Sequence, residues 1–535
     1  MRLTQDCRCD VLVVGAGIAG ISAALEAAAL GRRVILISSA QIFSGSSFYP
    51  GTWGLGLIGP ADDGDRADLA ETIQTVGCGM ADPVMVRTFV DGIRPAIQRV
   101  RDMGVRLRRA NQGGEKEYIP CFDHKHRDWN GIEFDSAREV FSRRIEELGI
   151  QAVPNCELLE LAVSDGAVCG AVIAANGQPC YVGCDALVLA TGGYGGIYRY
   201  HLCTEDVTGV AQALALKAGC QLVNMEFLQM MSGYLSPAPK TIYNERTFRF
   251  TRFHSTDGTE LFPDTEQWHS LLEERSTYGP FTSRLPSREV DFAIFRAFLA
   301  DRHGVSASYS RELREHPPEF VTTYFDWLKE AKGLTMEDTV HLGVFAHAAN
   351  GGIQIAPDAS TGVPGLFACG EVTGGMHGAD RIGGLSTANG LVFGGIAGRS
   401  AARFHPISQG PDCWEFDFSA VTDSDSIREE LRDLMFQYGM VLRSGHGLGA
   451  GLDRLDALQT RLVKTPAQDM RRIIDSRRLE GQLLTARCIL LAALLRRESR
   501  GAHYREDYPT ADASQARPIE IAYQSGELLA RFREG

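Results

Sequence analysis

The hydrophobic pattern of the chain begins with an apolar run at residues 10–14, which a glycine-rich turn at 15–20 connects to an alanine-rich stretch ending near residue 30. A second short apolar run, residues 33–37, follows Gly31. Short apolar runs are typical of buried strands, and a longer apolar stretch closed by glycine is typical of a helix. The pattern therefore predicts a strand, a helix and a second strand, which together form a βαβ unit.

The turn between the first strand and the helix has the spacing of a dinucleotide-binding motif. Gly15 permits a tight turn, Gly17 lets the backbone approach a pyrophosphate, and Gly20 lets the helix lie against the sheet. The N–H groups at the start of the helix then face the phosphates. We predict that this turn, including Ala16, binds a dinucleotide.

The loop after the second strand is the next candidate contact region. The strand ends in Ser38 and Ser39, where an acidic ribose-binding residue is usual, and a hydroxyl replaces that hydrogen bond only in part. Residues 44–56 then contain four glycines and three serines. A flexible surface loop is the alternative, but a position directly after the βαβ unit favours contact with the ligand. The candidate contacts in this loop are Ser46, Ser47, Phe48 and Gly54.

A second strand-to-glycine turn lies far along the sequence. The strongly apolar residues 186–190 lead directly into Thr191, Gly192 and Gly193. Ligands bind beyond the carboxyl ends of parallel strands, so two such turns can converge on one extended cofactor when the chain returns to the same sheet. This arrangement predicts a dinucleotide domain made of two pieces.

A third apolar run, residues 366–369, ends at Gly370 and Glu371. The glycine-rich residues 377–386 follow and open a helix that runs through residue 402. Helix starts that follow glycine turns offer N–H groups to anions or ring oxygens. Glu371 and the residues at the helix start, Ser386 and Thr387, are therefore further candidate cofactor contacts.

Composition and charge narrow the function classes. A chain of 535 residues exceeds the size of a single core, so two or three domains are expected. The net charge of −13 argues against extensive binding of nucleic acid. The thirteen cysteines are scattered without the paired spacing of zinc or iron–sulfur ligands, so we expect no metal site. No apolar run reaches the roughly 20 residues of a membrane span, and we expect a cytoplasmic protein.

Taken together, these stretches resemble the flavoprotein family of succinate dehydrogenase, fumarate reductase and L-aspartate oxidase. The resemblance covers nearly the whole chain. It rests on these motifs in this order: GAGIAG, GSSFY, LVLATGGYGGIY, AGCQLVNMEFLQ, HAANGGI, VPGLFACGE, HGADRIGGLS and RRESRGAHYREDYP at residues 496–509.

The resemblance implies an α/β fold. Its core is a two-piece Rossmann-like FAD-binding domain with an inserted α+β capping domain for the substrate, followed by a C-terminal helical region. From the pattern we expect four segments: the first FAD-binding part at 1–220, the capping domain at 221–341, the second FAD-binding part at 342–410 and the helical domain at 411–535. Residues 426–500 are expected to be helical from their periodicity.

The resemblance also implies how FAD is held. The glycine turns, Ser46, Ser47, Glu371 and residues 384–387 correspond to the family's contacts with FAD. Respiratory members link the flavin to a histidine in the loop after the second strand, and residues 41–56 contain no histidine. We therefore predict FAD bound non-covalently.

The resemblance assigns three catalytic candidates. His347, from an HxxxGG segment, and Arg381, from the segment HGADR, correspond to groups that bind a substrate carboxylate. Arg288 matches the family's proton-donating arginine, although Ser287 is inserted after the proline of that segment and Glu289 stands where it has aspartate. The alternatives are a core histidine for His347, a surface ion pair for Arg381, and pairing with Glu289 or a helix cap for Arg288.

Two departures from the family bear on the substrate. Where the family has EFxQFHPT, Met231 replaces the histidine and Gly233 the threonine that bind a second carboxylate. The Arg-Gly-Glu-Gly segment that supplies protons to the catalytic arginine is absent, although Glu245 and several arginines lie in that region. Lost hydrogen bonds change discrimination strongly. We therefore expect poor turnover of fumarate, succinate and aspartate, and favour an acid with one carboxylate and a bulkier, less polar far end.

Several functions agree with these residues. The first is an FAD-dependent enzyme that transfers hydride between flavin and a CH–CH bond of a small carboxylate, or oxidises an amine as L-aspartate oxidase does. The second is a flavoprotein subunit that exchanges electrons with a separate iron–sulfur, haem or flavin protein. The third is a flavin-binding assembly subunit without activity. A dehydrogenase that uses only nicotinamide is disfavoured, because it has no need of the second glycine turn or of Glu371.

Overall fold

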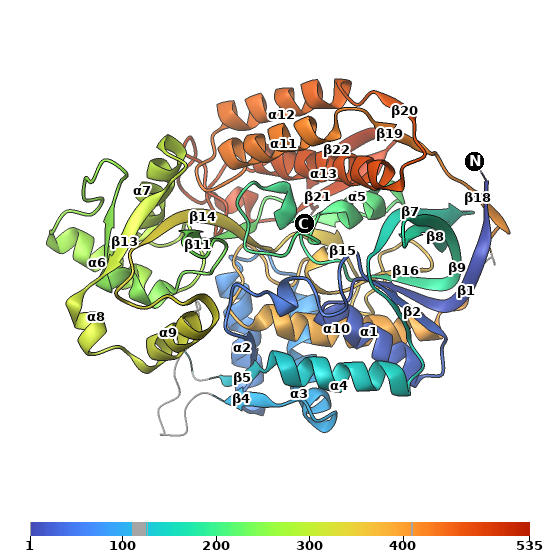
Figure 1. The fold of residues 1–535 in the computed structure, drawn as a ribbon, viewed down its shortest axis with the longest axis horizontal. Helices are drawn as coiled ribbons and strands as arrows, with labels where there is room; N and C mark the ends of the chain where they lie inside the picture. The colour runs from blue at the N-terminus through green and yellow to red at the C-terminus, as the bar shows by residue number, and fades with distance from the viewer. Residues whose placement is uncertain (1, 110–124, 126, 408–409, 535) are drawn as a thin grey trace.

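The computed structural model describes residues 2–109, 125, 127–407 and 410–534, and Figure 1 shows their arrangement. In these residues the largest sheet has eight strands, with the central order β6-β2-β1-β9-β8-β7, while β16 pairs with β9 and β18 with β1. The pairs β2–β1, β6–β2, β1–β9 and β16–β9 are parallel, whereas β7, β8 and the first half of β9 form an antiparallel meander. The strands are β1 (Arg2–Val14), β2 (Val34–Ile37), β6 (Gln151–Val153), β7 (Cys156–Ser164), β8 (Ala167–Ala175), β9 (Gln178–Leu189), β16 (Leu366–Ala368) and β18 (Cys413–Glu415).

The predicted βαβ unit is present as β1, α1 (Ile18–Ala29) and β2. The apolar residues 11–14 and 34–37 are buried on both faces of the parallel sheet, which explains why they do not alternate with polar residues. Between them Gly15 has a φ of +109°, and a Cβ atom there would lie 2.3 Å from the carbonyl oxygen of Ala190 at the end of β9. Only glycine fits this turn without strain.

A second helix, α10 (Leu385–Arg403), lies directly against α1. Its glycines make the contact: a Cβ at Gly394 would lie 2.5 Å from the carbonyl oxygen of Ala19, and one at Gly398 would lie 2.2 Å from that of Ala23. The backbones of the two helices are therefore in direct contact, with no side chain between them at these positions. This packing fixes the start of α10 beside the start of α1, where the cofactor contacts are expected.

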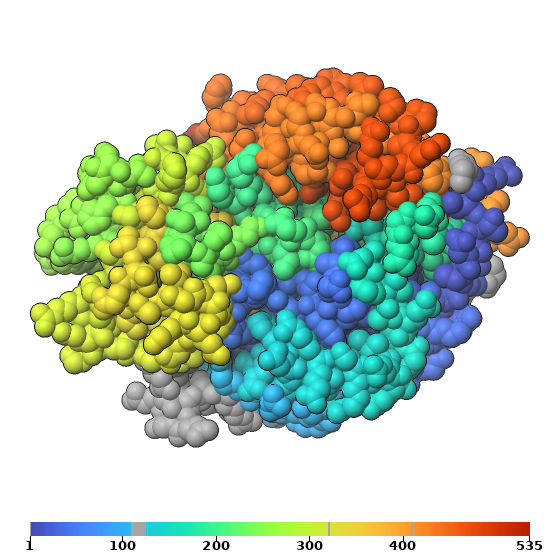
Figure 2. Space-filling view, in the orientation of Figure 1, coloured from blue at the N-terminus to red at the C-terminus, as the bar shows by residue number. Residues whose placement is uncertain are grey.

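The segment expected to form a cap is a separate lobe at the left of Figures 1 and 2. Its sheet has the order β11-β14-β13-β12, and it is covered by α6, α7, α8 and α9. The lobe contacts the FAD-binding half at Trp53, whose ring lies 5.0 Å from that of Tyr324. The elements are β11 (Leu228–Ser236), β12 (Thr251–His254), β13 (Val305–Tyr309), β14 (Val340–Ala349), α6 (Glu266–Arg275), α7 (Arg288–Ala300), α8 (Arg311–Glu315) and α9 (Glu319–Lys332).

A small antiparallel sheet and three helices follow the first glycine loop and lie at the bottom of Figure 1. They comprise β3 (Leu55–Gly59), β4 (Leu107–Arg109), β5 (Asp128–Ile132), α2 (Asp63–Val76), α3 (Pro83–Asp102) and α4 (Phe134–Glu147). The periodic apolar positions of α3, such as Phe89 and Ile93, are buried against α10 and β3. The short helix α5 (Val210–Lys217) starts beside the cofactor turns and contacts α13.

The C-terminal region contains three helices, at the top of Figure 1, and also strands. Its elements are α11 (Ser424–Tyr438), α12 (Gly445–Thr460), α13 (Met470–Leu495), β19 (Ser419–Val421), β20 (Lys464–Pro466), β21 (Ile519–Gln524) and β22 (Glu527–Phe532). The hairpin β21–β22 extends a sheet formed with β10 (Leu222–Val223), β15 (Gly352–Gln354) and β17 (Thr373–Gly374). The expectation that residues 426–500 are helical is confirmed in α11, α12 and α13 but is wrong at β20 and at the last five residues. At the latter, α13 has ended and Arg496 enters buried ion pairs.

These elements make up a mixed α/β molecule with a Rossmann-like FAD-binding half, an α+β lobe and a C-terminal region rich in helices, and the predicted fold class is confirmed. β14 crosses the predicted boundary between 341 and 342. In the described part of the chain, no helix is both long and apolar enough to cross a membrane.

Candidate active site

The glycine turns enclose one cavity between the carboxyl ends of the parallel strands and the starts of α1, α5 and α10. Residues from all of the predicted turns line it together. The predicted contacts that line this cavity are Gly15, Ala16, Gly17, Ser38, Ser39, Ser46, Ser47, Thr191, Gly192, Glu371, Ser386 and Thr387. The cavity is thus assembled from segments that are up to about 370 residues apart in sequence.

The polar groups of the cavity suit a polar ligand such as FAD. The hydroxyl oxygens of Ser46 and Thr191 are buried without a hydrogen-bond partner in the described structure. Ser47 accepts a hydrogen bond of 3.1 Å from the N–H of Ile18 and so supports the start of α1. Buried polar atoms normally have partners, so the unpartnered hydroxyls fit groups supplied by a ligand.

Four predicted cofactor residues lie outside the lining. Gly20 packs against the carbonyl oxygen of Gly15, and Phe48 is buried against the ring of Phe134 at 5.8 Å. Gly54 lies next to Arg108. Gly193 lies next to the carboxylate of Glu371, where a Cβ would come within 2.6 Å of Oε1. These four residues do not line the cavity.

Sequence reasoning missed two stretches that line the cavity. The first is residues 206–211 with Leu214, at the start of α5, and the second is residues 156–158 in β7. Asp206 accepts a hydrogen bond of 2.7 Å from the hydroxyl of Ser44 and so ties the first stretch to the glycine and serine loop. The pair Thr208-Gly209 just before a helix resembles the other turns and was the available signal.

Arg381 lies in the irregular loop between β17 and α10 and is buried, with 7% of its surface exposed. Its Nε donates to Oε1 of Gln229 at 3.0 Å, and Nε2 of Gln229 donates back to the carbonyl oxygen of Arg381 at 3.0 Å. The side chain is therefore held by β11 of the capping lobe. The alternative for Arg381, an ion pair on the surface, is excluded because the side chain is buried.

His347 lies in β14, the strand next to β11, and its Nδ1 is buried without a hydrogen-bond partner in the described structure. Burial, together with the nearby charge of Arg381, lowers the pKa of His347 to about 3. The imidazole is therefore neutral at physiological pH. In this state it can donate or accept a hydrogen bond at a ligand, but it cannot supply a positive charge.

Arg288 is the first residue of α7, and 29% of its side chain is exposed. Its Nη1 donates to the carbonyl oxygen of Ser283 at 2.9 Å, and its guanidinium lies over the ring of Tyr504 at 5.4 Å. Nε is 3.8 Å from Oε1 of Glu289, so the ion pair considered as the alternative is present at a long distance. An exposed pair of this kind contributes little to stability and leaves a role in catalysis open.

Met231 and Gly233, which stand where the family resemblance expects contacts to a second carboxylate, lie at an apolar cluster. Met231 is buried with Tyr49, Leu202 and Phe345. A Cβ at Gly233 would lie 2.9 Å from Cδ2 of Leu202 and 3.0 Å from Cδ2 of Phe345, so these side chains occupy the space of the missing threonine. The cluster begins two residues along β11 from Gln229, the partner of Arg381.

Two protein families match the sequence of this chain. The family described as FAD binding domain matches residues 10–246 and 297–387, and the family described as fumarate reductase flavoprotein C-term matches residues 428–529. This chain belongs to the fumarate reductase and succinate dehydrogenase flavoprotein family. It is an FAD-dependent oxidoreductase of that family.

The relatives of this flavoprotein span nearly its whole length. It is 28% identical to one of the subunits of the fumarate reductase (CoM/CoB) of Methanothermobacter marburgensis, with 96% of each chain covered. It is 27% identical to L-aspartate oxidase of Streptomyces coelicolor, covering 94% of this chain and 89% of the relative. The solved structure of Mycobacterium smegmatis Sdh1 in complex with UQ1 has the same fold, with a TM-score of 0.80, 24% identity, and coverage of 98% of this chain and 94% of that one.

A buried acid lies behind the first turn of α7 in this flavoprotein. Glu245 is buried, its Oε1 has no hydrogen-bond partner in the described structure, and burial raises its pKa to about 7. The charge of Arg275 opposes this rise. Arg275 is itself fully buried and pairs with Asp291, at 2.8 Å from Nε to Oδ2, one helical turn after Arg288.

A second buried acid directly precedes Arg381. Oδ2 of Asp380 accepts hydrogen bonds from Thr282 at 2.7 Å and from Nε of Arg284 at 2.8 Å, while Oδ1 is buried without a partner in the described structure. Burial raises the pKa of Asp380, and the charge of Arg284 opposes that rise. The motif HGADR contains Asp380, but the sequence alone assigned no role to it.

The described residues contain no group of three or more histidine, cysteine, aspartate or glutamate side chains placed to hold a metal ion.

Proposed function

We propose that this flavoprotein reduces the C=C bond of an unsaturated acid, or catalyses the reverse desaturation, and that the acid has one carboxylate and an apolar far end. The observation that carries the proposal is the apolar cluster of Tyr49, Leu202, Met231 and Phe345, in which Met231 lies two residues along β11 from Gln229, the partner of Arg381. A guanidinium binds one carboxylate. A dicarboxylate such as fumarate would place its second charge against apolar side chains, which is costly.

In this proposal Arg381 and the neutral His347 bind the carboxylate. The guanidinium provides the charge, and His347 provides an oriented hydrogen bond without adding a second positive charge at pH 7. Gln229 holds the guanidinium from the capping lobe, so a change in the position of the lobe moves the carboxylate site as well. Bound flavin supplies or accepts the hydride.

Arg288 is the proposed proton donor to the carbon that develops negative charge. An arginine can act in this way only toward a strongly basic centre, because its ordinary pKa is above about 12. We propose that the buried Glu245, which feels the charge of Arg275 near the start of α7, supplies the proton in place of the missing family segment. An acid with a pKa of about 7 can both gain and lose a proton near neutral pH.

The experiment that tests this function compares unsaturated acids. The holoenzyme is reduced anaerobically with dithionite and mixed with fumarate, crotonate or cinnamate, and reoxidation is followed at the flavin absorption band. We expect cinnamate or crotonate to reoxidise the flavin at least tenfold faster than fumarate. Faster reaction with fumarate would contradict the proposed specificity, and peroxide formation with L-aspartate in air would favour amine oxidation.

We also propose that FAD is bound non-covalently, because residues 41–56 contain no histidine. Acid precipitation of the holoenzyme should release yellow flavin into the supernatant. As a control, the pellet is digested with protease and its peptides are searched for flavin. Flavin retained on a peptide would show a covalent link and contradict the proposal.

A second candidate function is that of an electron-transferring subunit. A relative at 28% identity is named as one of the subunits of a fumarate reductase, which favours a separate partner for this chain. We propose that such a complex, if it forms, is cytoplasmic. Purification of the native protein by a C-terminal tag, followed by metal analysis of co-purifying chains, tests this alternative. A homogeneous single chain with full turnover would contradict it.

A further inference from the structure

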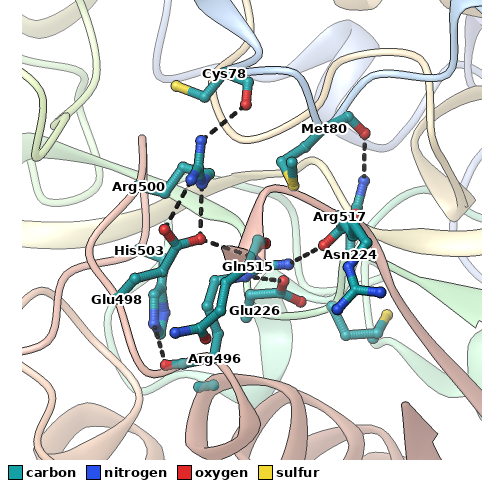
Figure 3. A network of polar contacts seen from close by, with 12 residues as sticks. Cys78, Met80, Asn224, Glu226, Arg496, Glu498, Arg500, His503, Gln515 and Arg517 are labelled. Atoms are coloured by element: carbon teal, nitrogen blue, oxygen red, sulfur yellow. Dashed lines mark hydrogen bonds and ion pairs between the residues drawn. The ribbon is translucent and has the colours of Figure 1, made fainter. Parts of the chain in front are cut away.

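The segment after α13, residues 496–505, is an irregular strap that bonds both to the loop just before Arg288 and to the loop that carries Arg381. It leaves the end of α13 at Arg496 and runs past the turn at residues 77–80, as Figure 3 shows. No residue of this strap is among the proposed ligands of substrate or FAD. The charged side chains of Arg496, Glu498 and Arg505 are nevertheless buried, which calls for an explanation.

The strap contacts the Arg381 loop through Ala379. The N–H of Ala502 donates to the carbonyl oxygen of Ala379 at 3.1 Å. On its other side, the N–H of Ala379 donates to the carbonyl oxygen of Gly77 at 3.0 Å. Gly501 has a φ of +54°, and a Cβ there would lie 2.7 Å from Cβ of Ala379. The loop that carries Arg381 two residues later is therefore clamped between the strap and the turn.

The same strap contacts the Arg288 loop. The N–H of Ser283 donates to the carbonyl oxygen of Gly501 at 2.8 Å, and the carbonyl oxygen of Ser283 accepts the hydrogen bond of 2.9 Å from Arg288. Tyr504 lies under the guanidinium of Arg288 at 5.4 Å. Adjacent residues of one segment, Gly501 and Ala502, thus bond to both catalytic loops.

Glu498 holds the strap in place. Its fully buried carboxylate accepts from Nη1 of Arg496 at 2.9 Å and from Nε and Nη2 of Arg500 at 2.7 and 2.8 Å (Figure 3). Nη1 of Arg500 then donates to the carbonyl oxygen of Cys78 at 3.1 Å, in the turn that bonds Ala379 from the other side. The strap, the turn and the Arg381 loop therefore form a closed ring of contacts.

We propose that Glu498 and Arg500 are positioning residues, which set the separation between the carboxylate-binding Arg381 and the proton-donating Arg288 through the backbone of Gly501 and Ala502. Substrate must contact both arginines at once, so their separation has to be fixed within a fraction of an ångström. The loops themselves are irregular and come from different lobes. A bidentate ion pair in a buried setting is rigid, which suits this task.

The first test is independent of the substrate. Hydrogen exchange of the holoenzyme, resolved by mass spectrometry, reports the amides of Ser283 and Ala502 directly. In Glu498→Gln we expect exchange at both amides to be at least tenfold faster, with FAD content unchanged. Because loss of a buried partner can destabilise the whole chain, Arg500→Gln is the second variant. It keeps the pair of Glu498 with Arg496 and should accelerate the same two amides.

The matched control is Asp507→Asn. Asp507 lies just beyond the end of the strap. It pairs with Arg505 at 2.8 Å and accepts a hydrogen bond from the N–H of Gly445. It contacts neither catalytic loop through any of these bonds. We expect exchange at Ser283 and Ala502 to change less than twofold. Unchanged exchange in both Glu498→Gln and Arg500→Gln, or equal acceleration in Asp507→Asn, would overturn the inference.

The second test rests on the proposed function and uses cinnamate as the probe. Arg500→Gln should raise the cinnamate concentration for half-maximal reoxidation and lower the limiting rate, each at least tenfold, because both arginines are displaced. Oxidation of the reduced flavin by ferricyanide should not change, since it requires neither arginine. If the wild type fails to reduce any acid of the panel, the proposed function fails. In that case the exchange measurement still decides the positioning role.

Discussion

The two halves of the active site are built in different ways. The cavity that fits FAD is formed by glycine turns and helix starts, such as those at Gly15 and Thr191, whose positions are set by the backbone of one sheet. The proposed substrate half is formed by side chains from separate lobes, and its Arg381 is held by a partner remote in sequence, Gln229. The difference teaches that cofactor binding follows from local motifs, whereas substrate choice depends on long-range contacts that can change without altering the fold.

The largest expected effect comes from Arg288→Gln, which tests whether the substrate half can fail while the cofactor half stays intact. Glutamine keeps much of the hydrogen bonding to Ser283 but cannot transfer a proton. Loss of a well-placed acid lowers the rate by about 10²–10⁴. We expect single-turnover reoxidation by the reactive acid to fall at least a hundredfold, measured in a stopped-flow instrument under anaerobic conditions.

The control for Arg288→Gln is Glu289→Gln, which removes the long ion pair at 3.8 Å but keeps the arginine. This control should react within about twofold of the wild type, because an exposed pair is weak. FAD content and melting temperature should match the wild type in both variants. A fall of less than tenfold in Arg288→Gln would assign the proton to another group, with Glu245 the first candidate.

Arg381→Ala is expected to have the next largest effect, on binding of the acid. Loss of a charge-assisted hydrogen bond costs about 1.5–3 kcal/mol, which is roughly 10 to 150-fold in affinity. We expect the half-saturating concentration of the acid to rise by this factor, while oxidation of reduced flavin by artificial dyes changes little. Arg381→Lys keeps the charge but loses the bond from Nε to Gln229. Its half-saturating concentration should therefore lie between those of the wild type and Arg381→Ala. Equal turnover in all three proteins would make Arg381 merely structural.

The cofactor half could be predicted from the sequence because its signals are local. A short apolar strand, a glycine turn and a helix start occur within about twenty residues, and each step has a simple physical cause, as for Gly15. The parts that were missed have weaker local signals. Residues 156–158 belong to an antiparallel strand, and only the return of β7 to the same sheet brings them to the cavity.

The substrate half could be predicted only residue by residue, through the family resemblance. Nothing near Arg381 in sequence indicates that Gln229, 152 residues away, bonds to it. The role of the segment at 496–505 could not be predicted for the same reason, since the fold alone brings the fully buried Arg496 and Glu498 to their partners. Helical periodicity does not reveal a buried ion pair, and so the expected helical span extends five residues past the end of α13.

A smaller effect is expected on the pH dependence of stability, which tests the buried acid Glu245. Its pKa in the folded chain, about 7, lies above the ordinary value of 4.5. The folded state therefore binds more protons between these values, and stability falls as pH rises from about 4.5 to 7. The total contribution is on the order of 3 kcal/mol. Glu245→Gln should remove this fall, measured as the difference in melting temperature between pH 5 and pH 8 relative to the wild type.

The control for that measurement is Glu273→Gln, an exposed carboxylate of the same lobe that pairs with Arg249 at 2.6 Å. It should leave the pH dependence as it is in the wild type. If Glu245→Gln and the wild type lose stability equally with rising pH, the acid is not titrating in this range. The proposed proton source for Arg288 would then have to be sought elsewhere.

The smallest expected effect is that of Met231→His. This substitution tests how far one histidine raises the preference for a dicarboxylate. A new hydrogen bond contributes about 1 kcal/mol, or roughly fivefold to tenfold in discrimination. We expect the ratio of fumarate to cinnamate reoxidation rates to rise by no more than this factor. The rest stays lost because the rings and methyl groups of Phe345 and Leu202 fill the space at Gly233. Adding Gly233→Thr should therefore lower the melting temperature before it improves fumarate turnover. A rise of a hundredfold in Met231→His alone would show that the apolar cluster is not what excludes fumarate, and the specificity would then have to be set on the Arg381 side.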